Sequence, residues 1–265
     1  MMSLEEVRVR VFNEKGEEDG EAPIPSFILQ TDVEEYLVRK AFLAAQSKRL
    51  QPQGRDMMAG KRTTAESWGV GYGIARVPRT ERGVARLAPM TVKGRVTHPP
   101  RVEKKIRKEI NRKEYRKAFL SALSAVFRKE VVENRGHRPG SASIPIVFTK
   151  EFENVSKTRE VVGLLEKIGL KQELERVYSR PRVRCGKSSW RGRRLRRRVG
   201  PLIVVSNHRA SIVKAASGIP GVDVRTPEKL SIMDLAPGGM PGRLTVWTLP
   251  ALEGVVKRVR KYVAE

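Results

Sequence analysis

Two segments of the chain collect residue types that can bind phosphate groups. The first, residues 54–79, has the sequence GRDMMAGKRTTAESWGVGYGIARVPR, with five glycines, the basic pair Lys61 and Arg62, and one tryptophan. Glycine allows close approach of the backbone to a ligand, and arginine forks onto phosphate oxygens. The segment is therefore a candidate phosphate-binding loop of an enzyme, a flexible linker, or an extended arm that grips a charged partner.

The glycine motifs of nucleotide-binding enzymes do not fit this segment. A P-loop needs four residues between its glycines, followed by Lys and then Ser or Thr. Here five residues separate Gly54 from Gly60, and Arg62, which cannot ligate magnesium, stands in the hydroxyl position. The run from Gly69 to Gly73 imitates a dinucleotide-binding turn, but no strand-like segment precedes it. We therefore expect no cofactor.

The aromatic residues of the first segment favour an extended binding arm over a flexible linker. Trp68 and Tyr72 are poor linker residues, whereas rings interleaved with Gly and Arg suit stacking on bases beside phosphate contacts. Residues 48–101 hold twelve Lys or Arg against three acids and lack clear periodicity, over a length well beyond an ordinary connection. The candidate RNA-binding residues of this loop are Arg55, Lys61, Arg62, Trp68, Tyr72, Arg76, Arg79, Arg82, Arg86, Lys93 and Arg95.

The second segment, residues 179–200, has the sequence SRPRVRCGKSSWRGRRLRRRVG, with ten basic residues and no acid. Like charges repel, yet the run is internal and adjoins the apolar run PLIVVS, which favours a polyanionic partner over simple solvation. Trp190 could stack on a base or pack on the folded domain, and the sequence leaves both open. The candidate RNA-binding residues here are Arg182, Arg184, Lys187, Trp190, Arg191, Arg193, Arg194, Arg196, Arg197 and Arg198.

No catalytic or metal-binding constellation is apparent. Histidine occurs only at 98, 137 and 208, without a Cys or carboxylate cluster at ligand spacing, so we expect no metal site. His208, beside Ser206 and Asn207, is better interpreted as part of a helix start than as a triad member. The single cysteine, Cys185, rules out an intramolecular disulfide and fits a reducing compartment.

The charge balance points to a polyanionic partner. Lys plus Arg number 54 and Asp plus Glu number 29, for a formal net charge of +25. A compact particle with this excess repels itself unless a polyanion neutralises it, so nucleic acid is the first candidate partner and an anionic membrane surface the second. No apolar run is long enough to span a bilayer, and the acidic N-terminus does not resemble a signal peptide. We expect a soluble intracellular protein.

The pattern of elements predicts an α/β fold. We expect strands near 7–12, 202–206, 222–224 and 244–247, which form a mainly parallel four-stranded sheet in a three-layer domain. The segment 144–149 (IPIVFT) is a strand or simply extended. Helices are expected after a capping box at 31–34, along 102–133, and after caps at 156, 206 or 207, 226 and 248. The globular domain should comprise 1–47 and 102–265, with 48–101 as an extended loop and 179–200 as a basic RNA-binding segment inside the domain.

Several strings resemble a known family. GRDMMAGKRTTAESWGVGYGIARVPR resembles the internal loop of the universal large-subunit ribosomal protein four family in its archaeal and eukaryotic form. KTREVVGLLEKIGL and RVRCGKSSWRGRRLRRRVGPLIVVS are similar to later segments of that family. The resemblance extends from the first strand to about residue 250, and AGKRTTAESWG together with RGRRLRRRVGPLIVV is highly specific.

The resemblance implies an α/β domain on the solvent side of the large subunit and an arm that penetrates the RNA core. The tip of the arm would help to form the narrow point of the nascent-peptide exit tunnel, opposite another ribosomal protein. The implied activity is structural, namely folding and holding large-subunit rRNA during assembly. This chain has Tyr72 where family members often carry arginine. The implied tip residues are Glu66, Ser67, Trp68, Gly69, Gly71 and Tyr72.

The leading interpretation is thus a cytoplasmic, non-enzymatic protein of the large ribosomal subunit. Its expected partners are large-subunit (23S-type) rRNA and neighbouring ribosomal proteins, without a membrane or a small-molecule substrate. A nucleotide-utilising enzyme with a basic substrate groove is the second hypothesis, which the imperfect glycine motifs disfavour. A free nucleic-acid chaperone is the third, and it is compatible with the first.

Overall fold

The computed structural model describes residues 6–179 and 181–264. The chain divides into two compact units: unit 2 is Ser47–Lys108, and unit 1 comprises the residues before and after it. The sequence-based loop, 48–101, lies inside unit 2, and the basic segment 179–200 belongs to unit 1. Each unit is described by itself below.

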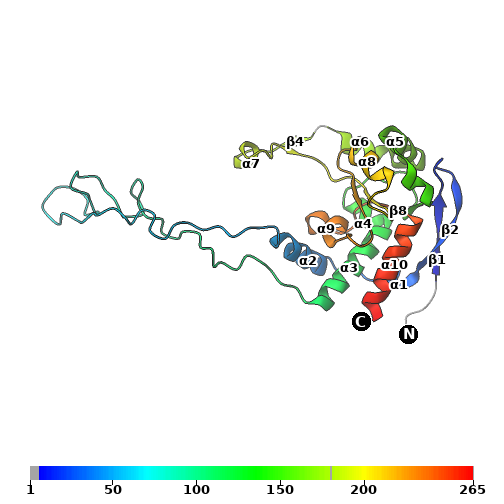
Figure 1. The fold of residues 1–265 in the computed structure, drawn as a ribbon, viewed down its shortest axis with the longest axis horizontal. Coiled ribbons are helices and arrows are strands. Elements are labelled where there is room, and N and C mark those ends of the chain that lie inside the picture. Colours follow the sequence, from blue (N-terminus) through cyan, green and yellow to red (C-terminus); the bar gives the residue numbers. More distant parts are fainter. Residues whose placement is uncertain (1–5, 180, 265) are drawn as a thin grey trace. The chain divides into compact units, whose positions relative to one another are not determined.

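A six-stranded sheet with the order β2-β1-β3-β8-β6-β7 forms the centre of unit 1 (Figure 1). All neighbouring strands run parallel except β2, which pairs antiparallel with β1. This confirms the expected α/β fold with a mainly parallel sheet. The strands are β1 (Glu6–Phe12), β2 (Glu18–Pro25), β3 (Ile146–Phe148), β6 (Leu202–Val204), β7 (Asp223–Arg225) and β8 (Thr245–Thr248).

The predicted number of four strands is wrong because β2 and β3 also join the sheet. β3 has only three residues, too few for a period to distinguish it from other extended backbone. β2 has the sequence EDGEAPIP, in which acids, glycine and proline replace the usual strand formers. Such residues occur on edge strands, where proline need not donate to a neighbour and charge discourages further pairing.

Alternate residues of the parallel strands face two separate cores, which confirms the three-layer arrangement. Val147, Leu202, Val204 and Trp247 pack with one group of helices, while Ile146, Phe148 and Ile203 pack with another. Leu202 to Val205 are fully buried, as a central parallel strand requires. The first group comprises α1 (Ser26–Gln30), α2 (Glu35–Ser47), α3 (Arg112–Phe127), α9 (Ile232–Leu235) and α10 (Leu249–Ala264). The second comprises α5 (Thr158–Leu165), α6 (Lys171–Tyr178) and α8 (Ser211–Ser217), with the short α4 (Lys129–Asn134) beside them.

Short irregular helices connect these elements. A 3-10 helix, η1 (Lys150–Asn154), follows β3, and a second, η3 (Pro237–Gly239), precedes β8. A π-helical turn, η2 (Glu166–Leu170), joins α5 to α6 and contains Gly169 at φ 101°. The predicted helix end at Gly169 therefore corresponds to a kink, after which the chain continues as α6.

Several predicted helix starts are wrong. Residues 102–110 are not helical, although Val102, Ile106 and Ile110 lie four apart, and α3 begins only after its cap, Asn111. The apolar spacing there has no core to face, since Val102 is exposed and Ile106 only half-buried. The helix expected after 31–34 does form as α2, but Thr31 is not its cap: the Val38 amide donates to the Glu34 carbonyl (3.1 Å) at the helix start, and the Thr31 hydroxyl donates to the Phe27 carbonyl at the end of α1 (2.7 Å).

Two further starts are displaced along the chain. α8 begins at Ser211 rather than after Ser206 or Asn207, and a turn occupies the residues between. The helix expected after a cap at Thr226 begins only at Ile232, as α9, and Ser231 and Asp234 form the capping box that precedes it. The final helix follows Thr248 directly, as predicted.

Unit 2 has no core of its own. Residues 48–108 are all described, and none of them is buried. Its outgoing and returning segments run side by side (Figure 1): a Cβ on Gly60 would lie 2.5 Å from the carbonyl atoms of Gly94. The Ser47 hydroxyl accepts a hydrogen bond from the Lys108 amide (2.9 Å) where the two segments meet.

Candidate nucleic-acid interface

The tip of unit 2 presents two aromatic rings on a glycine-rich backbone. The ring centroids of Trp68 and Tyr72 are 5.8 Å apart, and the two side chains are 41% and 63% exposed. Gly69, Gly71 and Gly73 all have positive φ, with open space where a Cβ would stand. Exposed rings on such a backbone are suited to contact with a partner surface.

Two of the predicted RNA-binding arginines stabilise the turns behind this tip. Glu66 and Arg79 exchange two backbone hydrogen bonds (2.9 and 3.0 Å), which close the tip into a loop. Nη1 of Arg79 donates to the Gly83 carbonyl (2.8 Å), and Nη1 of Arg86 donates to the Val92 carbonyl (2.6 Å). Nε of Arg79 is buried without a partner, so this guanidinium retains one donor to satisfy.

The other predicted basic residues of unit 2 differ in whether they form an ion pair with an acidic residue. Arg62 forms an ion pair with Asp56, and this hydrogen bond lowers the pKa of the Asp56 carboxyl below its ordinary value. The remaining predicted cations are exposed, and no ion pair engages them among the described residues. They are Arg55, Lys61, Arg76, Arg82, Lys93 and Arg95.

The second basic segment forms a small hairpin in unit 1, here called the basic hairpin (residues 181–199). β4 (Arg182–Val183) pairs antiparallel with β5 (Leu195–Arg196), and the single-turn helix α7 (Lys187–Trp190) lies between them (Figure 1). All ten predicted RNA-binding side chains of this segment are exposed, while Arg180 lies outside the described residues. Trp190 is 83% exposed, so it does not pack on the domain.

A buried carboxylate anchors the base of the basic hairpin. Glu173 of α6 is fully buried and accepts from Nε and Nη2 of Arg176 (2.8 and 2.6 Å) and from the Arg138 amide (3.0 Å). Its Oε1 also lies 2.7 Å from Nδ1 of His137. The same Arg176 donates to the Val199 carbonyl (2.6 Å), which ties the end of the hairpin to the network.

The protonation states of this network follow from its contacts. Burial opposes ionisation of Glu173, but hydrogen bonds from Arg176 and His137 prevail and lower its pKa to about 2. Burial lowers the pKa of His137, so at neutral pH its ring is uncharged and donates from Nδ1 to Glu173. Burial, with Arg243 and Arg176 nearby, also lowers the pKa of Arg135 to about 10, which leaves it charged at neutral pH.

A cavity of about 760 Å³ opens beside this anchor, at the amino ends of the sheet strands. Within the described part of the chain, seven arginines and no acid line it. Arg135, Arg138 and Arg176 were not predicted, because the Glu173 network joins residues about 36 positions apart and leaves no local pattern. The only local signal is the i, i+3 spacing of Glu173 and Arg176. The arginines are Arg135, Arg138, Arg176, Arg182, Arg196, Arg197 and Arg198.

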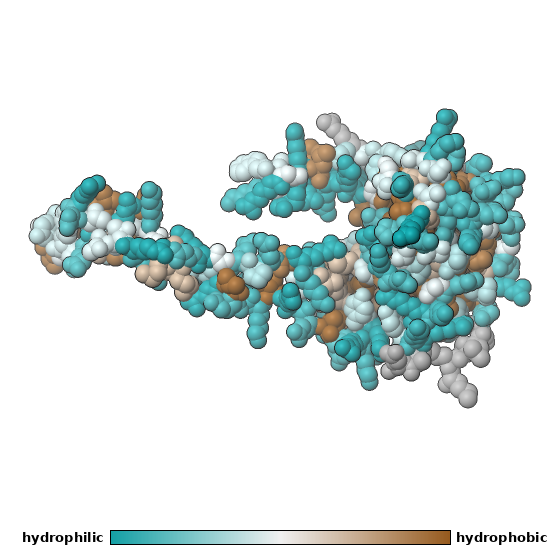
Figure 2. Space-filling model, viewed as in Figure 1, coloured by the Kyte–Doolittle hydropathy of each residue, from teal (hydrophilic) through white to brown (hydrophobic). Residues whose placement is uncertain are grey.

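The surface of both units is mainly hydrophilic on the face that Figure 2 shows. Among the residues that the structure describes, no group of three His, Cys, Asp or Glu side chains could hold a metal ion. Within the same residues, no helix combines the length and the apolar character needed to cross a membrane.

Comparisons with known proteins match almost the whole chain. Residues 22–258 match the sequence model of the Ribosomal protein L4/L1 family. The protein named Large ribosomal subunit protein uL4 of Sulfolobus acidocaldarius is 45% identical over 93% of either chain. The protein of the same name from Sulfurisphaera tokodaii is 43% identical over 97% of either chain. The one from Aeropyrum pernix is 44% identical over 94% of this chain and 92% of the relative. These matches confirm the resemblance and reject the enzyme hypothesis: the chain belongs to the ribosomal protein L4/L1 family, as a structural constituent of the large ribosomal subunit.

Proposed function

We propose that unit 2 and the basic hairpin both bind large-subunit rRNA, and that the tip of unit 2 lines the nascent-peptide exit tunnel. The observation that carries this proposal is the composition of unit 2, a long cationic segment in which no residue from 48 to 108 is buried. Such a segment cannot fold around its own apolar residues, so its order must come from a partner.

The energetics of unit 2 favour an RNA partner. Ordering backbone costs about 1–2 kcal/mol per residue, which a segment without buried apolar surface cannot offset internally. Contacts with phosphate groups release counterions and can offset this cost. Lys61, Arg76 and Arg82 are exposed and without an acid partner among the described residues, so they are available for such contacts.

The tip suits a narrow channel in RNA. Gly69, Gly71 and Gly73 carry no side chains and leave open space around the backbone, which allows close approach to bases and sugars. Trp68 and Tyr72 offer ring faces for stacking on unpaired bases. Tyr72, the more exposed of the two, is our candidate for the side chain that faces the tunnel.

Deletion of residues 56–78 tests this division of roles. We expect the shortened protein to fold, to bind rRNA through the basic hairpin, and to fail in late assembly of the subunit. Binding to an rRNA fragment, circular dichroism and sedimentation with large subunits after a high-salt wash measure these three properties. Complete loss of rRNA binding on this deletion alone, or release of the intact protein by the wash, would contradict the proposal.

A further inference from the structure

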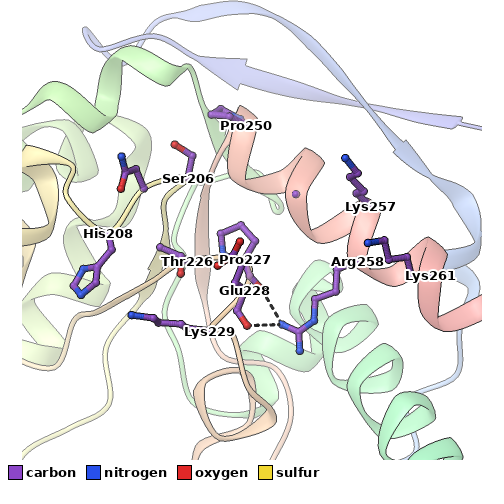
Figure 3. A pocket seen from close by; sticks show the side chains of 12 residues that line it. Ser206, His208, Thr226, Pro227, Glu228, Lys229, Pro250, Lys257, Arg258 and Lys261 are labelled. Atoms are coloured by element: carbon purple, nitrogen blue, oxygen red, sulfur yellow. Dashed lines mark hydrogen bonds between the residues drawn. The ribbon is translucent and has the colours of Figure 1, made fainter.

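A second cavity, of about 740 Å³, lies at the opposite edge of the sheet from the basic hairpin. It is lined by the loop that follows β6, by the segment that follows β7, and by the outer face of α10 (Figure 3). These are the carboxyl ends of parallel strands, where open α/β sheets usually bind their ligands. The cavity is therefore in the position at which this class of fold recognises another molecule.

The lining of this cavity is strongly cationic. Lys229 follows β7, and Lys257 and Lys261 lie one turn apart on α10, while Glu228 is the only carboxylate among the described residues of the lining. The three lysines are exposed, and no ion pair engages them among the residues that the structure describes. Lys257 and Lys261 are like charges at i, i+4, an arrangement that destabilises a helix, although Glu253 lies one turn before Lys257 and the helix dipole favours Lys261 in the last turn.

Arg258 holds the two sides of the cavity together. Its Nη1 donates to the carbonyls of Pro227 (2.7 Å) and Leu230 (2.9 Å), and its Nε donates to the Tyr262 hydroxyl (2.8 Å). The guanidinium also lies 4.7 Å from the centre of the Phe119 ring. Arg258 is therefore a structural residue that fixes the 227–230 segment on α10, and it leaves the lysines as the cations available to a ligand.

Several hydrogen-bonding groups at this edge are already engaged within the protein. Glu153 of η1 is buried and accepts from the amide and hydroxyl of Ser206 (2.7 and 2.6 Å) and from the Thr248 hydroxyl (2.6 Å). The Asn207 side-chain oxygen accepts from the Arg209 amide (3.0 Å). What remains in the lining is the charge of long lysine side chains, together with the polar side chains of His208 and Thr226.

We propose that this carboxyl-edge cavity is a further binding site for RNA, in which Lys229, Lys257 and Lys261 neutralise backbone phosphates. Lysine acts on phosphate as a flexible point charge, which suits a polyanion that passes through an open cavity more than a small ligand that must be oriented. Because the basic hairpin lies at the amino ends of the same strands, the two sites contact different stretches of RNA. This inference rests on the proposed rRNA-binding function.

The test measures lysine reactivity on the intact protein. Acetylation of the full chain, followed by mass spectrometry, is compared with and without a large-subunit rRNA fragment. We expect Lys229, Lys257 and Lys261 to become at least several-fold less reactive with RNA. Lys117, Lys171 and Lys214, which are also exposed but line neither cavity, serve as matched controls and should keep their reactivity.

Variants give a second, independent measurement. Replacing the three cavity lysines with Gln should make the slope of log affinity against log salt shallower by about 2, as expected for three lost phosphate contacts. The same replacement at Lys117, Lys171 and Lys214 should change it by less than half as much. Replacing the cavity lysines with Arg should keep the slope of the original protein, since the charge is retained.

The possible results distinguish failure of this proposed site from failure of the proposed rRNA-binding function. If the original protein shows a steep slope but the cavity lysines stay reactive with RNA, the carboxyl-edge site is wrong while rRNA binding by the hairpin stands. If ATP or inorganic phosphate at millimolar concentration protects these lysines and the RNA fragment does not, a small phosphate ligand occupies the cavity and the proposal fails. A slope near zero for the original protein would overturn both proposals.

Discussion

The basic hairpin and unit 2 present positive charge in two different ways. The hairpin is tied to a folded unit through Glu173, which is fully buried and holds Arg176 and His137. Unit 2 has no buried residue from 48 to 108, and its few internal hydrogen bonds join exposed or half-buried turns.

This difference shows where the order of each region originates. The conformation of the hairpin is maintained by the core of unit 1, so its arginines are positioned before RNA arrives and less entropy is lost on binding. Unit 2 must be ordered by its partner. The first four predictions below test or refine this comparison, in order of decreasing effect on the free protein.

A charge in the centre of the sheet should abolish folding of unit 1. Val204 is fully buried in β6, so Val204→Asp places an unpaired carboxylate between both cores. The cost, about 5 kcal/mol or more, is comparable to the whole stability of a domain, and we expect no soluble protein on expression. Val199→Asp makes the same change on the exposed hairpin and should remain soluble. A well-folded Val204→Asp protein would contradict the placement of the core.

Removal of the anchor charge should destabilise unit 1 less severely. Glu173→Gln leaves Arg176, which is largely buried, without its counter-ion, and we expect a loss of about 3 kcal/mol in denaturant unfolding. Because the native pKa of Glu173 is about 2 and its unfolded value is near 4.5, its contribution is fully present above pH 4.5 and is lost as the pH falls toward 2. The Gln variant should lack this part of the acid dependence, whereas Glu166→Gln, at an exposed position, should retain it. Parallel stability curves for the original and Glu173→Gln proteins below pH 5 would show that the anchor is unimportant.

The hairpin arginines should affect binding without affecting stability. With roughly ten phosphate contacts, the slope of log affinity against log salt should be about −7 to −9 for the intact protein. Replacing Arg193, Arg194, Arg196, Arg197 and Arg198 with Ala should make it shallower by about 4, with an unchanged unfolding midpoint. Replacement of the exposed acids Glu17, Glu18 and Asp19 is the control and should leave the slope unchanged. An unaltered slope in the arginine variant would remove the hairpin from the interface.

A substitution inside unit 2 should have the smallest effect on the free protein. Gly60 has φ +79°, and a Cβ there would lie 2.5 Å from Gly94 carbonyl atoms, so Gly60→Ala separates the outgoing and returning segments. If unit 2 has no stability of its own, the unfolding midpoint of the free protein should not change, while incorporation into large subunits should fall. Gly83→Ala has a similar φ (+78°) and would meet no atom closer than 3.5 Å, so it isolates the effect of the contact. A lower midpoint for Gly60→Ala would mean that unit 2 is part of the cooperative fold.

The sequence was sufficient to predict the central strands and the exposed basic side chains. It did not reveal the residues that hold those side chains in place. The apolar run at 202–205 requires burial on both faces, and the exposed basic residues keep their charge whatever surrounds them. β2 was missed because an edge strand tolerates acids and proline, and the helix over 102–110 was wrongly predicted because apolar spacing cannot show whether a core exists to receive it.

The anchor network and the carboxyl-edge cavity were missed for a related reason. Glu173 and His137 meet only through the tertiary fold, and Lys229 joins Lys257 and Lys261 only because Arg258 fixes the segment after β7 on α10. Sequence spacing reveals contacts within one helix or one hairpin, and both of these sites bring together residues from several elements.

Limited trypsin digestion of the full-length protein, free and in assembled large subunits, tests the contrast between the two regions most directly. In the free protein we predict first cleavage in unit 2, at Arg55, Lys61, Arg62, Arg76 or Arg79, with slower cleavage in the anchored basic hairpin and none in the helices of unit 1. In assembled subunits the same unit 2 sites should be protected. First cleavage within unit 1 while unit 2 stays intact in the free protein would contradict the account, since unit 2 would then have an order that does not depend on RNA.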